Sequence, residues 1–202
     1  MINIDFEELN LLLAGLKEGE ITLVIFNDKT TAKIISNYLV ASQGKTLFIS
    51  TDFHPSEMIN NEKIKVIDAY SLDKGLKPRE QDVAVYVNSI NDISLETSAA
   101  ISNEDVKLLS VFTISTLFNK NPKDAVKSFI EVVNGRLKEK SGTLLLFSDE
   151  KSEEIEFLKS ISAIIINIKN EGDKIIIKSN KFPEPLELVI LEKKVIVKWK
   201  EQ

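Results

Sequence analysis

Three short apolar runs, separated by a helix-like segment and longer stretches, constrain the fold of this chain most strongly. They span Ile21–Phe26, Thr46–Ser50 and Thr143–Phe147. A run that is apolar along its length, rather than at alternate positions, indicates a strand buried on both faces, as in a parallel sheet. Between the first two runs, residues 31–42 carry apolar side chains at helical spacing and end before Gly44. The pattern predicts an α/β fold.

The remaining segments extend this pattern. We expect further strands at Ile64–Ile67 and Val83–Val87, and helices over Glu104–Phe118 and from Pro122 to about Lys140. Strands that alternate with helices predict a mostly parallel sheet with helices on both faces. The last part of the chain changes character and predicts an antiparallel β-hairpin extension of that sheet. Its expected strands are Ala163–Ile168, Lys174–Lys178, Leu186–Ile190 and Lys194–Lys198.

Composition limits the chemistry that the chain can carry. Its 202 residues predict a single domain, residues 1–202. There is no cysteine and one histidine, His54, which excludes disulfides, thiolate metal sites and multi-histidine metal sites. The net charge of −5 disfavours nucleic-acid binding, because such domains are usually basic. The sequence has no apolar signal core or run of ~20 apolar residues, so we expect a cytoplasmic protein without a membrane anchor.

The stretch from Gly19 to Asp52 carries the most information about function. A strand leads through a short turn to Lys29-Thr30-Thr31 and a helix, and the next strand ends in Ser-Thr-Asp52. This order resembles the RecA-like P-loop ATPases, in particular the KaiC/RadA branch that is common in archaea. Val83–Ser89 is similar to the family strand that normally ends in Asp-Ser, and Gly142–Ser148 to a later core strand. The resemblance implies a three-layer RecA-like P-loop fold.

The phosphate-binding loop of that family is not present in its working form. A Walker A loop, G-x-x-x-x-G-K-[ST], needs glycines so that successive backbone N–H groups can wrap a phosphate. Here Phe26–Lys29 is about three residues shorter than that motif and contains no glycine. Asp28 stands in place of the last glycine and puts a carboxylate where a polyphosphate would lie. Two like charges ~4 Å apart repel by about 1 kcal/mol even in water.

Two further family residues are replaced at matching positions. The resemblance places the Mg²⁺-holding Walker B aspartate at Asn88, and an amide is a poor ligand for a hard cation. Asp52 keeps the first of two acids that follow the second strand, but Phe53 replaces the second, and a phenyl ring accepts no proton from water. We therefore expect no bound ATP or Mg²⁺, no metal site and no hydrolysis.

Several residues allow two interpretations. Lys29, Thr30 and Thr31 are either a residual anion site or a helix cap beside a solvated lysine. His54 is either a base or a polar loop residue. No lysine or arginine occurs between Arg79 and Lys107, so this acidic segment would repel DNA and is either a solvated loop or a surface for a basic partner.

These observations favour a non-catalytic RecA/KaiC-like protein, a pseudo-ATPase that acts through protein contacts as a regulatory or accessory factor. Its expected partner is a RecA-like ATPase paralogue or a second copy of the chain. Two alternatives remain open at this point. One is a recombination or repair accessory protein that resembles RadA paralogues and binds single-stranded DNA weakly. The other is an NTPase with a noncanonical site built from Lys29, Asp52 and Asp28.

Overall fold

A computed structural model of the protein describes residues 3–4, 18–41, 44–57, 63–172, 174–181, 186–191 and 194–199; for 3–4, 186–191 and 194–199 it describes the backbone alone. The strands are β1 (Asn3–Ile4), β2 (Ile21–Phe26), β3 (Thr46–Ser50), β4 (Ile64–Asp68), β5 (Val83–Ala84), β6 (Leu108–Phe112), β7 (Thr143–Asp149), β8 (Ile164–Asn170), β9 (Lys174–Ser179), β10 (Leu186–Leu191) and β11 (Lys194–Trp199). The helices are α2 (Lys29–Ala41), α3 (Ile90–Asn103), α4 (Ile114–Lys120), α5 (Lys123–Glu139) and α6 (Ile155–Ile161).

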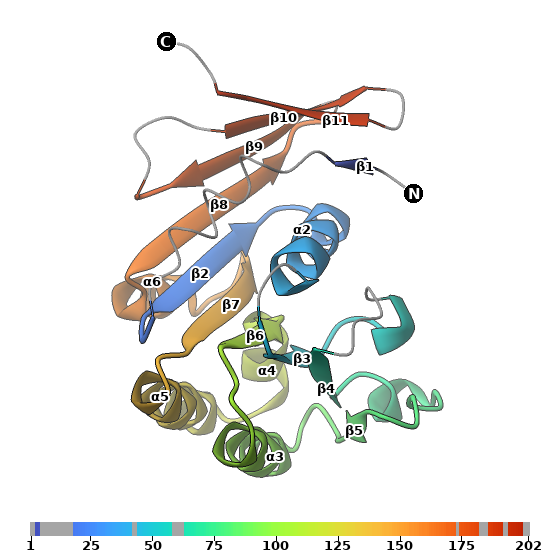
Figure 1. Ribbon diagram of the computed structural model, residues 1–202, viewed down its shortest axis with the longest axis vertical. Coiled ribbons are helices and arrows are strands. Elements are labelled where there is room, and N and C mark those ends of the chain that lie inside the picture. Colours follow the sequence, from blue (N-terminus) through green and yellow to red (C-terminus); the bar gives the residue numbers. More distant parts are fainter. Residues whose placement is uncertain are drawn as a thin grey trace.

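All of these strands belong to one sheet, in the order β1-β11-β10-β9-β8-β2-β7-β6-β3-β4-β5 (Figure 1). From β8 to β5 every neighbouring pair is parallel. From β8 to β11 the pairs are antiparallel, and β1 adds a short parallel pairing to β11. The predicted mostly parallel sheet with an antiparallel extension is confirmed.

Helices cover both faces of the sheet. The buried side of α2 packs on a face that carries Val24, Phe48 and Leu145. The other face carries Leu23 and Leu146 and is covered by α3, α4, α5 and α6, whose buried residues share its core cluster. Figure 1 shows α2 on one side of the sheet and α5 and α6 on the other. The expected three layers, with helices on both faces, are therefore present.

Two predictions between residues 83 and 118 are wrong. Residues 104–118 do not form one helix, because Leu108–Phe112 is the fully buried strand β6 and Ile114 starts the separate helix α4. A long apolar run looks the same whether it is a buried strand or a buried helix, since neither shows a clear period. Conversely, 90–103 is the helix α3, so the prediction of a solvated loop there is wrong, whereas the alternative of a surface for a basic partner stays a prediction. Ile90, Ile93 and Thr97 of α3 face the core at helical spacing.

The edge of the sheet beyond β4 is shorter than predicted. Only Val83–Ala84 pairs with β4, although Val85 still donates its N–H to the Asp68 carbonyl at 3.0 Å. The predicted strand Val83–Val87 is thus present only as the short edge strand β5.

The expected strands of the C-terminal part are present as β8 to β11, with Gly172 at φ 90° in the turn between β8 and β9. None of the helices in the described ranges combines the length and apolarity that a bilayer span requires.

Candidate functional site

The chain reverses its direction across the sheet between β2 and β7. After β2 the connection through α2 runs to β3 on one side, whereas after β7 the connection through α6 runs to β8 on the other side and on the opposite face. Ligands of open α/β sheets bind outside the carboxyl ends of the strands at such a switch point. A pocket of about 420 Å³ lies there. Its lining residues are Phe26, Lys29, Thr113, Ser115, Thr116, Asn119, Asp149, Lys151, Ser152 and Glu153.

The carboxylate of Asp28 caps the N-terminus of α2. Its Oδ2 accepts hydrogen bonds from the Thr31 backbone N–H at 2.8 Å and from the Thr31 hydroxyl at 2.6 Å, and its own carbonyl accepts the first intrahelical bond, from Ala32. The Thr31 hydroxyl, more than any other contact, lowers the pKa of Asp28 below its ordinary value. An anion of the protein itself therefore occupies the position at which a helix N-terminus would attract a phosphate.

A second contact ties this turn to the β8–β9 hairpin. Asn27 and Asn170 pair reciprocally: the Asn170 N–H donates to Asn27 Oδ1 at 2.8 Å, and Asn27 Nδ2 donates to the Asn170 carbonyl at 3.2 Å. The Asn170 side-chain amide also donates to Thr31 Oγ1 at 2.9 Å and to Asp28 Oδ2 at 3.4 Å. The Asn170 side chain and backbone thus hold the turn after β2, and the Thr31 N–H and hydroxyl are already paired with protein groups.

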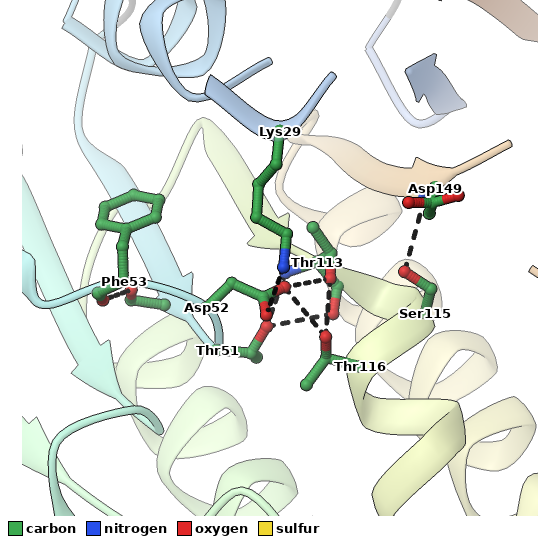
Figure 2. A network of polar contacts seen from close by, with 9 residues as sticks. Lys29, Thr51, Asp52, Phe53, Thr113, Ser115, Thr116 and Asp149 are labelled. Atoms are coloured by element: carbon green, nitrogen blue, oxygen red, sulfur yellow. Dashed lines mark hydrogen bonds and ion pairs between the residues drawn. The ribbon is translucent and has the colours of Figure 1, made fainter. Parts of the chain in front are cut away.

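Lys29 and Asp52 meet across the carboxyl edge (Figure 2). Lys29 Nζ lies 2.9 Å from Asp52 Oδ1, with the lysine side chain 54% exposed and the aspartate 13% exposed. Asp52 Oδ2 accepts from the hydroxyls of Thr113 and, at 2.9 Å, Thr116. Protein donors therefore occupy about three of the four acceptor positions of this carboxylate. The carboxylate is held in place by an ammonium from α2 and by two hydroxyls from the junction of β6 and α4.

The ends of β3 and β6 are joined just below this carboxylate. The Thr113 N–H donates to Thr51 Oγ1 at 2.6 Å, and the Thr51 hydroxyl donates to the Thr113 carbonyl at 3.1 Å. The peptide bond between Phe112 and Thr113 is cis. Because both threonines are almost fully buried, this reciprocal pair fixes the position of the Asp52 network on the sheet.

Phenylalanine rings fill the α2 side of the same edge. Phe26 and Phe112 stack with ring centroids 5.9 Å apart, and Phe112 also contacts Phe147 and Phe53 at 5.2 Å each. Phe53 is 5% exposed and lies in the core cluster under α2. The position at which the family resemblance expects a second acid is therefore occupied by a core side chain rather than by a group facing the pocket.

The structure brings together most, but not all, of the predicted site residues. Asp28 and Thr31 form the cap of α2, so the capping side chain is Asp28 rather than Thr30 or Thr31. Lys29 forms the ion pair with Asp52 while its side chain stays largely exposed. Thr30 is exposed in the first turn of α2. His54 lies in the loop after β3, where its Nδ1 accepts the Ser56 N–H at 3.1 Å and its Nε2 lies 3.1 Å from the Lys77 carbonyl.

The prediction for Asn88 is wrong. It is an exposed residue after β5, the edge strand, and β4, β3, β6 and β7 separate that strand from β2. The strand whose end does lie beside Lys29 and Asp52 is β6, and the residue there is Thr113. The misplacement follows directly from reading 104–118 as a helix, since that reading left Val83–Val87 as the next available core strand.

Sequence reasoning also missed residues that come from two later segments. Thr113, Ser115 and Thr116 lie at the start of α4, whereas Asp149 ends β7 and Lys151 lies in the loop after it. The signal for the second group was available, because the strand Thr143–Phe147 was predicted and the residues after a parallel strand lie at the same edge. Within the described residues, no group of three or more His, Asp or Glu side chains is placed to hold a metal ion.

Comparisons with known proteins add no family to this description. No protein-family model matches the sequence, and no curated protein is significantly similar to it.

Proposed function

We propose that this protein is a non-catalytic relative of the RecA/KaiC-like P-loop ATPases that acts through protein contacts. The observation that carries the proposal is the Asp28 carboxylate on the N-terminus of α2. A P-loop binds phosphate through the free N–H groups and positive end of this helix. Here an internal anion satisfies one of those N–H groups and opposes a second negative charge.

Three other contacts support the same conclusion. The Asn27–Asn170 pair holds the turn after β2 in its closed form. Lys29, the cation that would reach a phosphate, is paired with Asp52. Phosphoryl transfer depends almost entirely on positioning and charge stabilisation. Here the turn after β2 and the Lys29 ammonium both contact other groups of the protein. The end of β6 offers the hydroxyl of Thr113 where a magnesium site would need a carboxylate.

The direct test is a thermal unfolding scan of the whole protein with Mg-ATP and Mg-ADP. If ATP bound with a Kd of about 0.5 mM, 5 mM ligand would stabilise the fold by about 1.4 kcal/mol. For a domain of this size the corresponding rise in Tm is about 3 to 6 °C. We expect no such rise, and no phosphate release above that of Lys29→Ala. A rise of this size with ATP would refute the proposal.

The proposed mode of action has a separate test. If the partner is a second copy of the chain, sedimentation velocity should show a dimer whose fraction grows with protein concentration. If the partner is a RecA-like ATPase paralogue, this protein should instead remain monomeric and change the ATPase rate of that enzyme. A monomer that has no effect on any co-occurring ATPase would contradict the proposed mode while leaving the absence of nucleotide binding intact.

A further inference from the structure

The pocket at the switch point remains open although the turn after β2 is closed. Its lining comes mainly from the start of α4 and from the loop between β7 and α6, and Asp28 is not among the lining residues. Figure 2 shows Ser115 and Asp149 beside the Lys29–Asp52 network, on the α4 side of it. The volume of about 420 Å³ is in the range that holds a small molecule.

The four charged residues that line the pocket are two lysines and two acids, so their formal charges cancel, and half of them are already paired. Lys29 is paired with Asp52. Glu153 forms an ion pair at 2.9 Å with Lys123, which also contacts the buried Glu154 at 2.5 Å. These two pairs leave one lining cation and one lining anion, Lys151 and Asp149.

Both remaining groups are available to a ligand. Asp149 Oδ1 accepts the Lys151 backbone N–H at 2.8 Å, but its Oδ2 and the Lys151 ammonium make no hydrogen bond or ion pair with the part of the chain that the structure describes. Lys151 is exposed and Asp149 is half-buried. The pocket therefore offers one free negative group at the end of β7 and one free positive group in the loop that follows.

Neutral donors lie beside these two charges. The Ser115 hydroxyl oxygen accepts the Asp149 N–H at 3.4 Å, which leaves its proton free to donate into the pocket. Asn119 contributes an exposed side-chain amide with no hydrogen bond to any described residue. A ligand carboxylate at Lys151 would thus find additional donors.

We propose that this pocket binds a small zwitterion of amino-acid type, with its ammonium on Asp149 and its carboxylate on Lys151 and Ser115. A phosphate ester would meet no net positive charge here, whereas a zwitterion satisfies both free groups at once. The inference rests on the proposed function in one respect, because it assumes that no nucleoside triphosphate binds at this edge of the sheet.

The experiment compares small probes by thermal shift and calorimetry on the whole protein. Glycine and L-serine carry both charges, acetate and methylamine carry one each, glycerol carries none, and inorganic phosphate tests for a simple anion site. We expect glycine or serine to bind at least tenfold more tightly than acetate or methylamine. Equal binding of acetate or phosphate, preferential binding of glycerol, or no binding by any probe would overturn the proposal.

Matched variants locate the binding and separate the two proposals. Asp149→Asn keeps an oxygen for the Lys151 N–H and removes the charge, and it should weaken zwitterion binding about tenfold, as should Lys151→Gln. Lys169→Gln changes an exposed lysine on β8 outside the pocket and should leave binding unchanged. Unaltered binding in Asp149→Asn and Lys151→Gln would also overturn the proposal. A Mg-ATP arm in the same assay reports on the proposed function alone, so either idea can fail without the other.

Discussion

The contacts of the Asp28 cap allow the loss of stability in Asp28→Ala to be predicted. In Asp28→Ala the Thr31 N–H loses its acceptor at 2.8 Å and the Thr31 hydroxyl loses its acceptor at 2.6 Å. Loss of an aspartate N-cap costs about 0.5 to 2 kcal/mol. Thr31 is 4% exposed, so water restores these bonds poorly and the cost should lie at the upper end, about 2 kcal/mol.

Asp28→Asn is the matched control. Asparagine caps helices about as well as aspartate, and its oxygen can accept the same two bonds. The variant therefore isolates the negative charge, and we expect it to cost less than half as much as Asp28→Ala. Urea unfolding at neutral pH gives both values, and for a domain of this size 2 kcal/mol corresponds to a fall in Tm of about 4 to 8 °C.

The pH dependence gives an independent check of sign. The pKa of Asp28 is lowered in the folded protein, so folding stabilises the ionised carboxylate relative to the protonated form. Its contribution to stability is fully present above the ordinary aspartate pKa of about 4 and is lost as the pH falls through the lower, folded-state pKa. The stability difference between wild type and Asp28→Asn should therefore shrink on acidification below about pH 4. A difference that grows on acidification, or Asp28→Ala as stable as wild type, would refute this account of the cap.

Three further substitutions test the surroundings of the site. Phe53→Ala removes a 5% exposed ring that contacts Phe112 and should cost about 3 to 5 kcal/mol in chemical denaturation; a loss below 1 kcal/mol would mean that the ring is not part of the core. Asn121→Ala should cost about 2 to 3 kcal/mol, because this buried side chain accepts the Ile90 N–H at 3.1 Å and donates to the Val87 carbonyl at 2.8 Å. In this variant, amide hydrogen exchange should become faster at the start of α3 in particular. Asn170→Ala should destabilise by about 1 to 2 kcal/mol and speed exchange at residues 27–31, whereas exchange confined to the β8–β9 hairpin would show that the asparagine does not hold the turn.

Much of the architecture could be predicted because a strand that is buried on both faces is apolar along its whole length. Ile21–Phe26 and Thr46–Ser50 are apolar along their length, and both are strands buried at every position. The helix between them could be predicted from its apolar spacing. Their order was enough to place Lys29 and Asp52 at one edge of the sheet, since both follow the carboxyl ends of parallel strands.

The central part of the chain defeated the same reasoning for a physical reason. Between Asp105 and Phe118 a buried strand leads almost directly into a buried helix, with Thr113 between them. The strand is buried at every position and the helix begins with buried residues, so no clear period appears across residues 108–118. The partners of Asp52 were missed with it, because Thr113 and Thr116 come from this junction.

The pairings that close the turn could not have been found from local pattern at all. Asn27 and Asn170 are separated by 143 positions and meet because β2 and β8 are neighbours in register. A sequence shows that an asparagine lies at a turn, but the identity of its partner depends on strand order. The Asp28 cap is a different case, because its partner Thr31 is only three positions away and an aspartate before a helix is a local capping signal.

The Asn27–Asn170 pair makes the turn after β2 depend on how β8 is aligned against β2. Successive side chains of a strand point to opposite faces, so a slip of one residue in β8 would carry the Asn170 amide away from Thr31 and Asp28. An insertion or deletion within β8 would therefore loosen the start of α2, although β8 is far from that helix in the sequence.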